Sequence, residues 1–245
     1  MSILKGQLQE NLEALRLKNI AENFENAISN ATKDKSTYFD FLSALIADEA
    51  IAKEDRAIER KIKLARFPFI KTIADFNWNH ADINRQQIEN FLRLKFLEDN
   101  ENIVFLGNCG LGKTHLAIAI GEKACRAGHS VLFASAVDII NDLIAAKEMN
   151  ALDKALKKFI NPKLLIIDEL GYLPVDKLGS DMLFQVISKR YESGSIILTT
   201  NRQYNEWGYV FNNDDVVASA ILDRVMHHCE SVVIKGDSYR MKKSI

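Results

Sequence analysis

A glycine-rich run at residues 107–114, GNCGLGKT, contains residue types that could hold phosphate groups. It lies between an apolar run at 103–106 and a helix-compatible run at 115–125, as a phosphate-binding loop requires. Glycines let backbone amides approach phosphate oxygens, and the start of the following helix adds partial positive charge. Lys113 is predicted to reach the β- and γ-phosphates of a nucleotide, and Thr114 to bind Mg²⁺. The alternative is a glycine-rich turn before an ordinary helix, and the strand–loop–helix context argues against it.

Two adjacent acids, Asp168 and Glu169, end an apolar run at residues 164–167. A strand buried on both faces has no structural need for paired carboxylates at its end. Asp168 is predicted to hold Mg²⁺, and Glu169 to orient and deprotonate an attacking water, because phosphoryl transfer depends on positioning and charge neutralisation. The alternative is a solvated acidic turn.

Short apolar runs separated by helix-compatible segments must position these groups. The predicted strands occupy residues 103–106, 131–133, 164–167, 196–198 and 232–234. Their apolar residues do not alternate with polar ones, which is typical of strands covered on both faces. Strands that alternate with helices indicate an α/β domain with a mostly parallel sheet.

The first third of the chain is predicted to be helical, because apolar residues recur there at helical spacing. Thr37 and Asp40 form a capping-box pattern at the start of a helix that we expect to end near Arg66, before Phe67 and Pro68. We therefore predict a helical domain at residues 1–66, with a role in binding a partner or DNA. A nucleotide-binding domain is predicted at residues 67–245.

The composition is that of an ordinary folded protein, with 245 residues, a net charge of −1 and 47% hydrophobic residues. The three cysteines form no CxxC pair, which favours a reducing compartment. No apolar run is long enough to span a membrane and no signal peptide is recognisable, so we expect a cytoplasmic protein without a membrane segment. His227 and His228 have no cysteine or carboxylate at metal-ligand spacing, so we expect them to be structural.

The runs GNCGLGKTH, LLIIDELG and ILTTN together resemble the DnaC/IstB-like group of AAA+ ATPases, and in particular the IstB-like transposition helpers. RFPFIKTIADFNW, ISKRYESGSIILTTN, ILDRVMHH and GDSYR are similar to the same family. The resemblance implies an α/β fold, an AAA+ P-loop three-layer core with a parallel five-stranded sheet and no C-terminal lid, after a small all-α N-terminal domain. It implies ATP and Mg²⁺ as cofactors, although this loop reads GNCG where many relatives have GPPG. The residues expected to hold the nucleotide are Gly107, Asn108, Cys109, Gly110, Leu111, Gly112, Lys113, Thr114 and His115.

The family pattern implies roles for three further residues. Asn201 matches the sensor-1 polar residue, Arg240 resembles the sensor-2 position and is expected to contact the nucleotide, and Arg224 matches the arginine finger. Such a finger acts on ATP bound by a neighbouring subunit, so the active site would be completed in a homo-oligomer. The alternatives are a loop asparagine at position 201 and, for Arg224, a surface ion pair with Asp223 or Glu230.

Two other arginines, Arg190 and Arg202, compete with Arg224 for the contact between subunits. Only five residues follow Arg240, which leaves no room for the helical lid of larger AAA+ proteins. We therefore expect the segment before the nucleotide core, with Ile73 or Phe76, to cover the adenine.

Two basic segments are candidates for binding double-stranded DNA through its phosphates, which gives affinity without sequence readout. The first lies at 53–71 and the second in a helical insertion at 135–161 that resembles a position lining a central channel in initiator-type relatives. A solvated helix face is the alternative for both. The candidate residues are Lys53, Arg56, Arg60, Lys63, Lys147, Lys154, Lys157 and Lys158.

These features favour an ATPase that assembles on DNA in an ATP-dependent manner and assists a transposase in insertion-sequence transposition. A DnaC-type loader of the replicative helicase is the first alternative, because it shares the core. A non-hydrolysing, ATP-gated binding module is a second, and Glu169 argues against it. A small-molecule kinase is a weaker option.

Overall fold

The computed structural model describes residues 2–80 and 82–236 of the 245-residue chain. Two compact units divide between Arg60 and Lys61. Among the described residues, every helix is too short or too polar to span a bilayer.

The second unit contains one five-stranded sheet, and all its strands run parallel in the order β2-β3-β4-β1-β5. The strands are β1 (Asn102–Leu106), β2 (Val131–Ser135), β3 (Leu164–Leu170), β4 (Ser195–Thr200) and β5 (Cys229–Val233). The predicted parallel sheet is therefore confirmed, and every predicted strand overlaps an observed one. Strand β3 extends to Leu170, so the two acids lie inside it rather than at its end.

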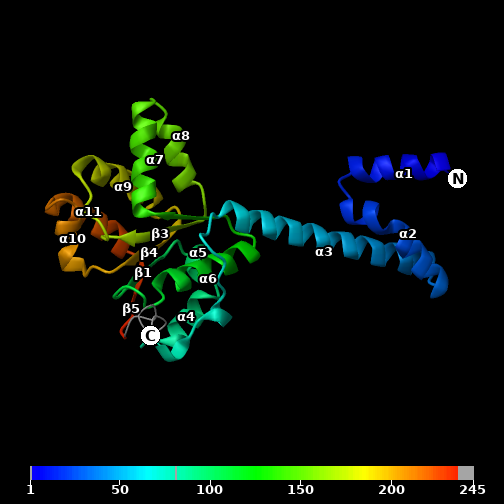
Figure 1. Cartoon of the computed structure of the whole chain (residues 1–245), viewed down its shortest axis with the longest axis horizontal. Coiled ribbons are helices and arrows are strands. Elements are labelled where there is room, and N and C mark those ends of the chain that lie inside the picture. Colours follow the sequence, from blue (N-terminus) through cyan, green and yellow to red (C-terminus); the bar gives the residue numbers. More distant parts are fainter. Residues whose placement is uncertain (1, 81, 237–245) are drawn as a thin grey trace, which may run out of the picture. The chain divides into compact units, whose positions relative to one another are not determined.

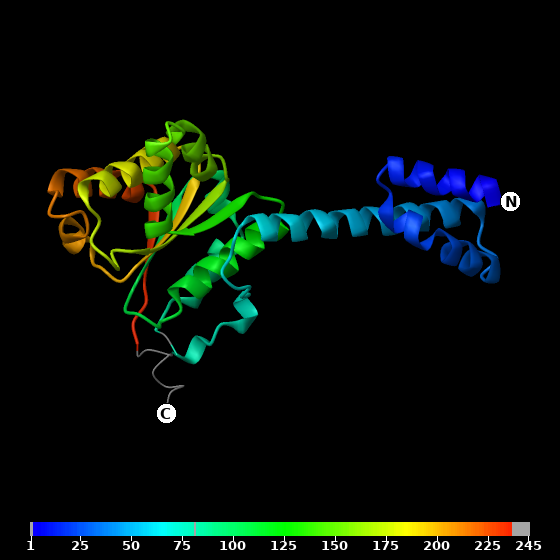
Figure 2. The same ribbon diagram turned by 45° about the horizontal axis from the view of Figure 1, so that its top comes forward.

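Helices cover both faces of this sheet, which gives the three layers expected of the fold (Figures 1 and 2). In β3, Leu165 and Ile167 pack into the core on one face, and Leu164 and Ile166 pack into the core on the other. This twofold alternation explains why the run is apolar at every position. No helix follows β5 in the described part of the chain, which ends at Gly236.

The helices of each layer come from separate stretches of the chain. The first face packs against α7 (Ala136–Glu148), α8 (Leu152–Ile160), α9 (Lys177–Arg190), α10 (Trp207–Val210) and α11 (Asp215–Met226). The second packs against α4 (Arg85–Phe91), α5 (Lys95–Glu98) and α6 (Lys113–Arg126). The described residues of this unit also form three short 3₁₀ turns, η1 (Ile73–Asp75), η2 (Trp78–His80) and η3 (Tyr204–Glu206).

The first unit is helical, as expected, with α1 (Ser2–Ala14), α2 (Lys18–Lys33) and most of α3 (Tyr38–Leu64). The predicted cap of α3 is confirmed, because the Asp40 amide donates to Thr37 Oγ1 over 3.1 Å. The helix ends at Leu64, two residues earlier than expected. Arg66 adopts a left-handed conformation with a φ of +59° that terminates it, and the Ala65 carbonyl accepts a hydrogen bond from the Phe133 amide instead.

A buried carboxylate links α2 to α3. Glu49 is 2% exposed, and its Oε2 accepts a hydrogen bond of 2.9 Å from the Ile20 amide. Arg56 Nη2 lies 2.7 Å from Glu49 Oε1. Burial alone raises the pKa of Glu49, but the hydrogen bonds from Ile20 and Arg56 outweigh it, so the pKa lies below its ordinary value.

Candidate functional site

The loop between β1 and α6 has a backbone that side chains would obstruct. Gly107 has a φ of +154°, and a Cβ there would lie 2.4 Å from the Ile234 carbonyl oxygen. Gly112 has a φ of +88°, and a Cβ there would lie 2.7 Å from Phe76 Cε2. Glycine is required at both positions, by conformation and by close packing. The loop backbone therefore depends on glycine at two of the positions that the predicted phosphate-binding pattern assigns to it.

Lys113 is the first residue of α6, directly after this loop. Its Nζ donates hydrogen bonds to the carbonyl oxygens of Gly107, over 2.7 Å, and Asn108, over 2.8 Å. The ammonium group of Lys113 is thus held against the backbone of the glycine-rich loop. A cation in this place adds to the positive end of the α6 dipole.

Asp168, a buried acid within β3, is hydrogen-bonded directly to the helix that follows the loop. Thr114 Oγ1 lies 2.9 Å from Asp168 Oδ1, and Asp168 is only 6% exposed. Thr199 Oγ1, from β4, donates to the same carboxylate oxygen over 2.5 Å. Two hydroxyl groups from neighbouring elements therefore orient Asp168.

Glu169 points differently from its neighbour, because the β3–β4 register shifts between Ile167 and Leu170. Its φ is +59°, its side chain is exposed, and its amide donates to Thr199 Oγ1 over 2.9 Å. Thr199 thus contacts both acids, accepting from the backbone of one and donating to the side chain of the other. Its hydroxyl thus joins the Asp168 carboxylate to the Glu169 backbone.

A cavity of about 500 Å³ opens beside the loop, a size that suits a nucleotide-sized ligand. The predicted residues that line it are Cys109, Gly110, Leu111, Gly112, Lys113, Thr114, His115, Glu169 and Asn201. The fold thus brings together segments separated by more than eighty residues of sequence. Gly107, Asn108, Asp168 and Arg224 are not among the lining residues, although Asp168 reaches the cavity through Thr114.

One wall of the cavity comes from the segment that precedes the nucleotide core. Phe76 lines the cavity, and its ring packs edge-on against Trp78 and His115, at centroid distances of 5.0 and 5.3 Å. His115 Nε2 lies 2.9 Å from the Thr72 carbonyl oxygen and so ties this segment to α6. Of the two residues expected to cover a base, Phe76 lines the cavity, whereas Ile73 packs against the apolar core.

Several lining residues are absent from the sequence-based prediction. They are Phe69, Lys71, Asp75, Asn77, Tyr172, Thr199 and Thr200. Thr199 and Thr200 directly follow the apolar run at 196–198, at the carboxyl end of a strand next to β3. Ligands of parallel sheets bind at the carboxyl ends of the strands. Two hydroxyl residues at the end of a predicted strand were therefore a sequence signal for a ligand-binding site. Phe69, an aromatic residue before the core, offers no comparable signal.

Arg224 lies on α11 and is partly exposed. Its Nη1 donates to the Ala220 carbonyl over 2.8 Å, and its Cζ lies 4.8 Å from the centre of the Phe184 ring. In the part of the chain that the structure describes, it forms no ion pair with Asp223 or Glu230. Arg240 lies outside the described residues.

Arg190 is not available for a contact between subunits, which removes it from the candidates. It is 1% exposed, and burial lowers its pKa to about 10. Its guanidinium donates to the carbonyl oxygens of Phe159, Ile160, Pro162, Lys163 and Ser195. Arg202 remains half exposed, with Nη1 3.7 Å from Glu206 Oε1.

Some of the lysines and arginines proposed to bind DNA form ion pairs within the protein, and others are exposed. Arg56 pairs with buried Glu49, and Lys158 pairs with Asp142. Lys53, Arg60 and Lys63 are exposed on α3. Lys147 on α7 and the pair Lys154 and Lys157 on α8 are also exposed.

Known proteins with similar sequences are also named as ATP-binding proteins. Residues 10–245 match the family described as IstB-like ATP binding protein. A protein of Geobacillus stearothermophilus, named as a putative ATP-binding protein of insertion sequence IS5376, is 39% identical over 98% of this chain and 96% of its own length. A protein of Bacillus thuringiensis subsp. berliner, named as a putative ATP-binding protein of insertion sequence IS232, is 42% identical over 96% of this chain and 94% of its own length.

The crystal structure of DnaI has the same fold, with a TM-score of 0.59, 18% identity, and coverage of 71% of this chain and 93% of that one. The fold likeness, the loop and the paired acids agree with the family match over almost the whole sequence. The chain therefore belongs to the family of IstB-like ATP-binding proteins.

Proposed function

We propose that this protein is an ATP-hydrolysing, DNA-binding AAA+ ATPase that assembles on double-stranded DNA and assists the transposase of an insertion sequence. The observation that carries the proposal is the cavity lined by the phosphate loop, Thr114 and Glu169, with Asp168 hydrogen-bonded to Thr114. The names of the relatives, which associate them with insertion sequences and ATP, support the choice of process.

The donor set fits Mg²⁺, which takes oxygen ligands and is commonly held by a hydroxyl, a carboxylate and nucleotide phosphates. Thr114 and Asp168 would hold the ion, which would neutralise charge on the phosphates when bound. The loop amides and Lys113 would bind the phosphates. Glu169, exposed at the cavity, would orient and deprotonate the attacking water, and Asn201 would hydrogen-bond the water or the γ-phosphate.

Arg224 would act on ATP held by a neighbouring subunit. It does not line the cavity of its own subunit, and its guanidinium is held by one carbonyl and one aromatic ring rather than by a carboxylate. Arg224 would therefore lose only these two weak contacts when it binds a phosphate. Hydrolysis would then depend on assembly, because each site needs a residue from the next subunit.

Contact with DNA is proposed for the exposed lysines of the α7–α8 pair, Lys147, Lys154 and Lys157. Replacing all three with alanine is expected to lower the salt dependence of DNA binding, with the slope of log K against log salt falling by about 0.9 for each phosphate that a lysine no longer neutralises. Fluorescence anisotropy at several salt concentrations measures the slope. A matched triple variant at the exposed Lys95, Lys123 and Lys177 should keep the original slope. An unchanged slope in the first variant would place the DNA-binding surface elsewhere.

The decisive test of the proposed function is the mass of the protein with and without DNA, ATP or a non-hydrolysable ATP analogue. We expect a large assembly only when DNA and nucleotide are both present, and its release when ATP is hydrolysed. Lys113→Ala should prevent assembly, whereas Lys123→Ala, an exposed change on the same helix, should not. A protein that stays monomeric in every condition and shows no ATPase activity would overturn the proposal.

The partner is tested separately by capture with purified transposase and purified replicative helicase. Binding to the transposase alone supports a role in transposition. Binding to the helicase alone would overturn that role in favour of helicase loading.

A further inference from the structure

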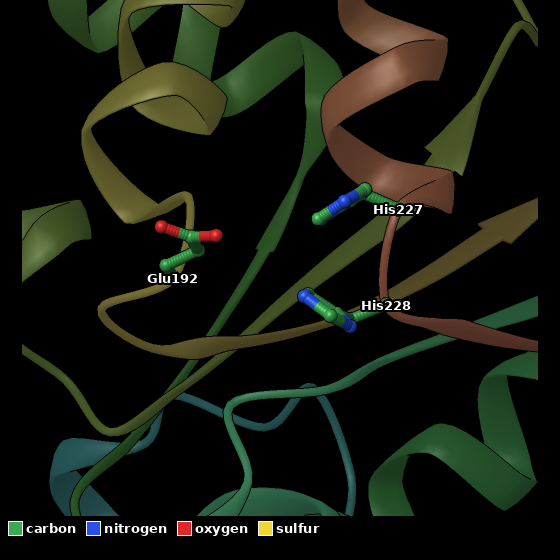
Figure 3. Close-up of side chains that lie close together, drawn as sticks. All are labelled: Glu192, His227 and His228. Atoms are coloured by element: carbon green, nitrogen blue, oxygen red, sulfur yellow. The ribbon is translucent and has the colours of Figure 1, made fainter.

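Glu192, His227 and His228 gather at a second place on the nucleotide-binding unit (Figure 3). One donor atom from each lies within 4.8 Å of the others, and all three side chains are exposed. Glu192 lies in the turn between α9 and β4, and the histidines lie at the junction of α11 and β5. The sequence has no carboxylate at metal-ligand spacing from the two histidines, but the fold places Glu192 beside them. The partner is thirty-five residues from His227 in sequence, where no spacing rule would find it.

The backbone that carries these side chains is anchored to one short segment. The His228 carbonyl accepts a hydrogen bond of 2.7 Å from the Asn102 amide. The Glu192 carbonyl accepts one of 3.2 Å from the Asn100 side chain. Glu192 also follows Arg190, whose buried guanidinium holds five carbonyl oxygens. The backbone at Glu192 and the backbone at His228 are thus both hydrogen-bonded to the segment at residues 100–102. Binding a ligand would then require only the side chains of the cluster to move.

Tyr191 supplies an outer contact of the kind that accompanies metal-binding histidines. Its hydroxyl oxygen lies 3.0 Å from His227 Nδ1. If Nδ1 carries the proton and donates to that oxygen, Nε2 is left as a free lone pair for an ion. The His227 and His228 rings lie 4.2 Å apart between centroids, with an interplanar angle of 68°.

We propose that Glu192, His227 and His228 form a binding site for a divalent transition metal of the zinc class. Two neutral imidazoles and one carboxylate are the donor set that Zn²⁺ accepts, with water completing the coordination. Mg²⁺ and Ca²⁺ prefer oxygen ligands alone, so the cluster should discriminate against them. Because the side chains are exposed, small rotations can bring their donor atoms to about 2.0–2.2 Å from an ion.

This site is separate from the proposed ATPase centre. The cluster lies where β4 and β5 begin, whereas the phosphate loop follows β1 and the two acids lie in the carboxyl-terminal half of β3. None of its residues lines the nucleotide cavity. The inference therefore stands or fails independently of ATP hydrolysis.

The test is a Zn²⁺ titration of the full-length protein, without a polyhistidine tag and without nucleotide, against a chromophoric zinc indicator. Excess Mg²⁺ is present to occupy Thr114 and Asp168. A Cys109→Ser background removes the exposed thiol of the phosphate loop. We expect one Zn²⁺ per chain. The single variants Glu192→Gln, His227→Ala and His228→Ala should each weaken binding by about tenfold or more.

His129→Ala serves as the matched control, because this histidine is partly exposed and lies outside the cluster. Thermal melting without metal checks that each variant is folded, and Co²⁺ absorption reports a coordinated ion directly. Tyr191→Phe should weaken binding more mildly than loss of a ligand. Equal zinc affinity in the parent protein and in a folded variant lacking both histidines would overturn the proposal, as would an equal loss in His129→Ala.

Discussion

Asp168 and Glu169 are adjacent in sequence, but their surroundings prepare them for different tasks. Asp168 is buried and bound by the hydroxyls of Thr114 and Thr199. Glu169 is exposed at the cavity and has a left-handed backbone conformation. A carboxylate held by hydroxyls suits an ion, whereas an exposed one is free to accept a proton.

Glu169→Gln is therefore expected to keep ATP binding and to lower the hydrolysis rate by about 10²–10⁴-fold, the usual contribution of a general base. The amide keeps the size of the side chain but cannot take a proton from water. A fluorescent ATP analogue measures affinity, and phosphate release measures turnover. Turnover at the parent rate would show that another group acts as the base.

Thr199 is the residue whose importance emerges from the fold. Thr199→Val keeps the shape of the side chain but removes the donor to Asp168 and the acceptor for the Glu169 amide. We expect a loss of about 1–3 kcal/mol in stability from the unsatisfied buried groups, and slower hydrolysis. Thr199→Ser keeps the hydroxyl and is the control. Urea unfolding and ATPase rates measure the two effects, and equal results for Val and Ser would contradict the assigned role.

At the scale of elements, the link between α2 and α3 should depend on pH. The folded-state pKa of Glu49 lies below its ordinary value of 4.5, so ionisation of this carboxylate stabilises the helical unit above that pH. The stabilisation is lost as the pH falls below 4.5 toward the folded-state pKa. Arg56 and the Ile20 amide then face a neutral acid.

Glu49→Gln should accordingly cost about 1–3 kcal/mol at pH 7, where the charged hydrogen bonds are complete. The difference from the parent protein should shrink below pH 4.5. Hydrogen exchange of the α1 and α2 amides in the full chain, corrected for its intrinsic pH dependence, measures the loss of stability at pH 7 and its change with pH. Glu54→Gln, on an exposed part of the same helix, is the control. A difference that stays constant with pH would argue against the ionic contribution.

Elements are predictable from sequence where their residues carry a local signal. Unbroken apolar runs between helical segments predict all five strands, because strands covered on both faces need apolar side chains at every position. Helix α3 ends earlier than its sequence pattern predicts, because Arg66 terminates it through a backbone conformation that residue type does not reveal. The meeting of Glu192 with His227, by contrast, depends on a contact between segments that are distant in sequence. Only the folded chain contains that information.

At the scale of the whole molecule, the proposed role of Arg224 makes hydrolysis a property of the assembly. Arg224→Ala should bind ATP normally and hydrolyse it poorly, as should Glu169→Gln. Mixed in equal amounts, the two variants should regain activity at about a quarter of the sites, where an intact Glu169 meets an intact Arg224. A mixture of Glu169→Gln with Lys113→Ala should regain none, because each subunit then has a defective site of its own. The measurement is the ATPase rate of each mixture in the presence of DNA. If the first mixture recovers no activity, Arg224 does not act on the ATP of a neighbouring subunit.

The buried guanidinium of Arg190 affects how arginine substitutions in this protein should be interpreted. It supplies the hydrogen-bond donors for carbonyl groups from the end of α8, the turn before β3 and the start of β4. Lysine offers fewer donors and no planar fork, so even Arg190→Lys would leave some of those carbonyls unsatisfied. A survey that replaces arginines one at a time and scores only activity would find Arg190 among the most damaging positions. It would be a false positive for a catalytic arginine, because its loss would dismantle the framework that carries the candidate site.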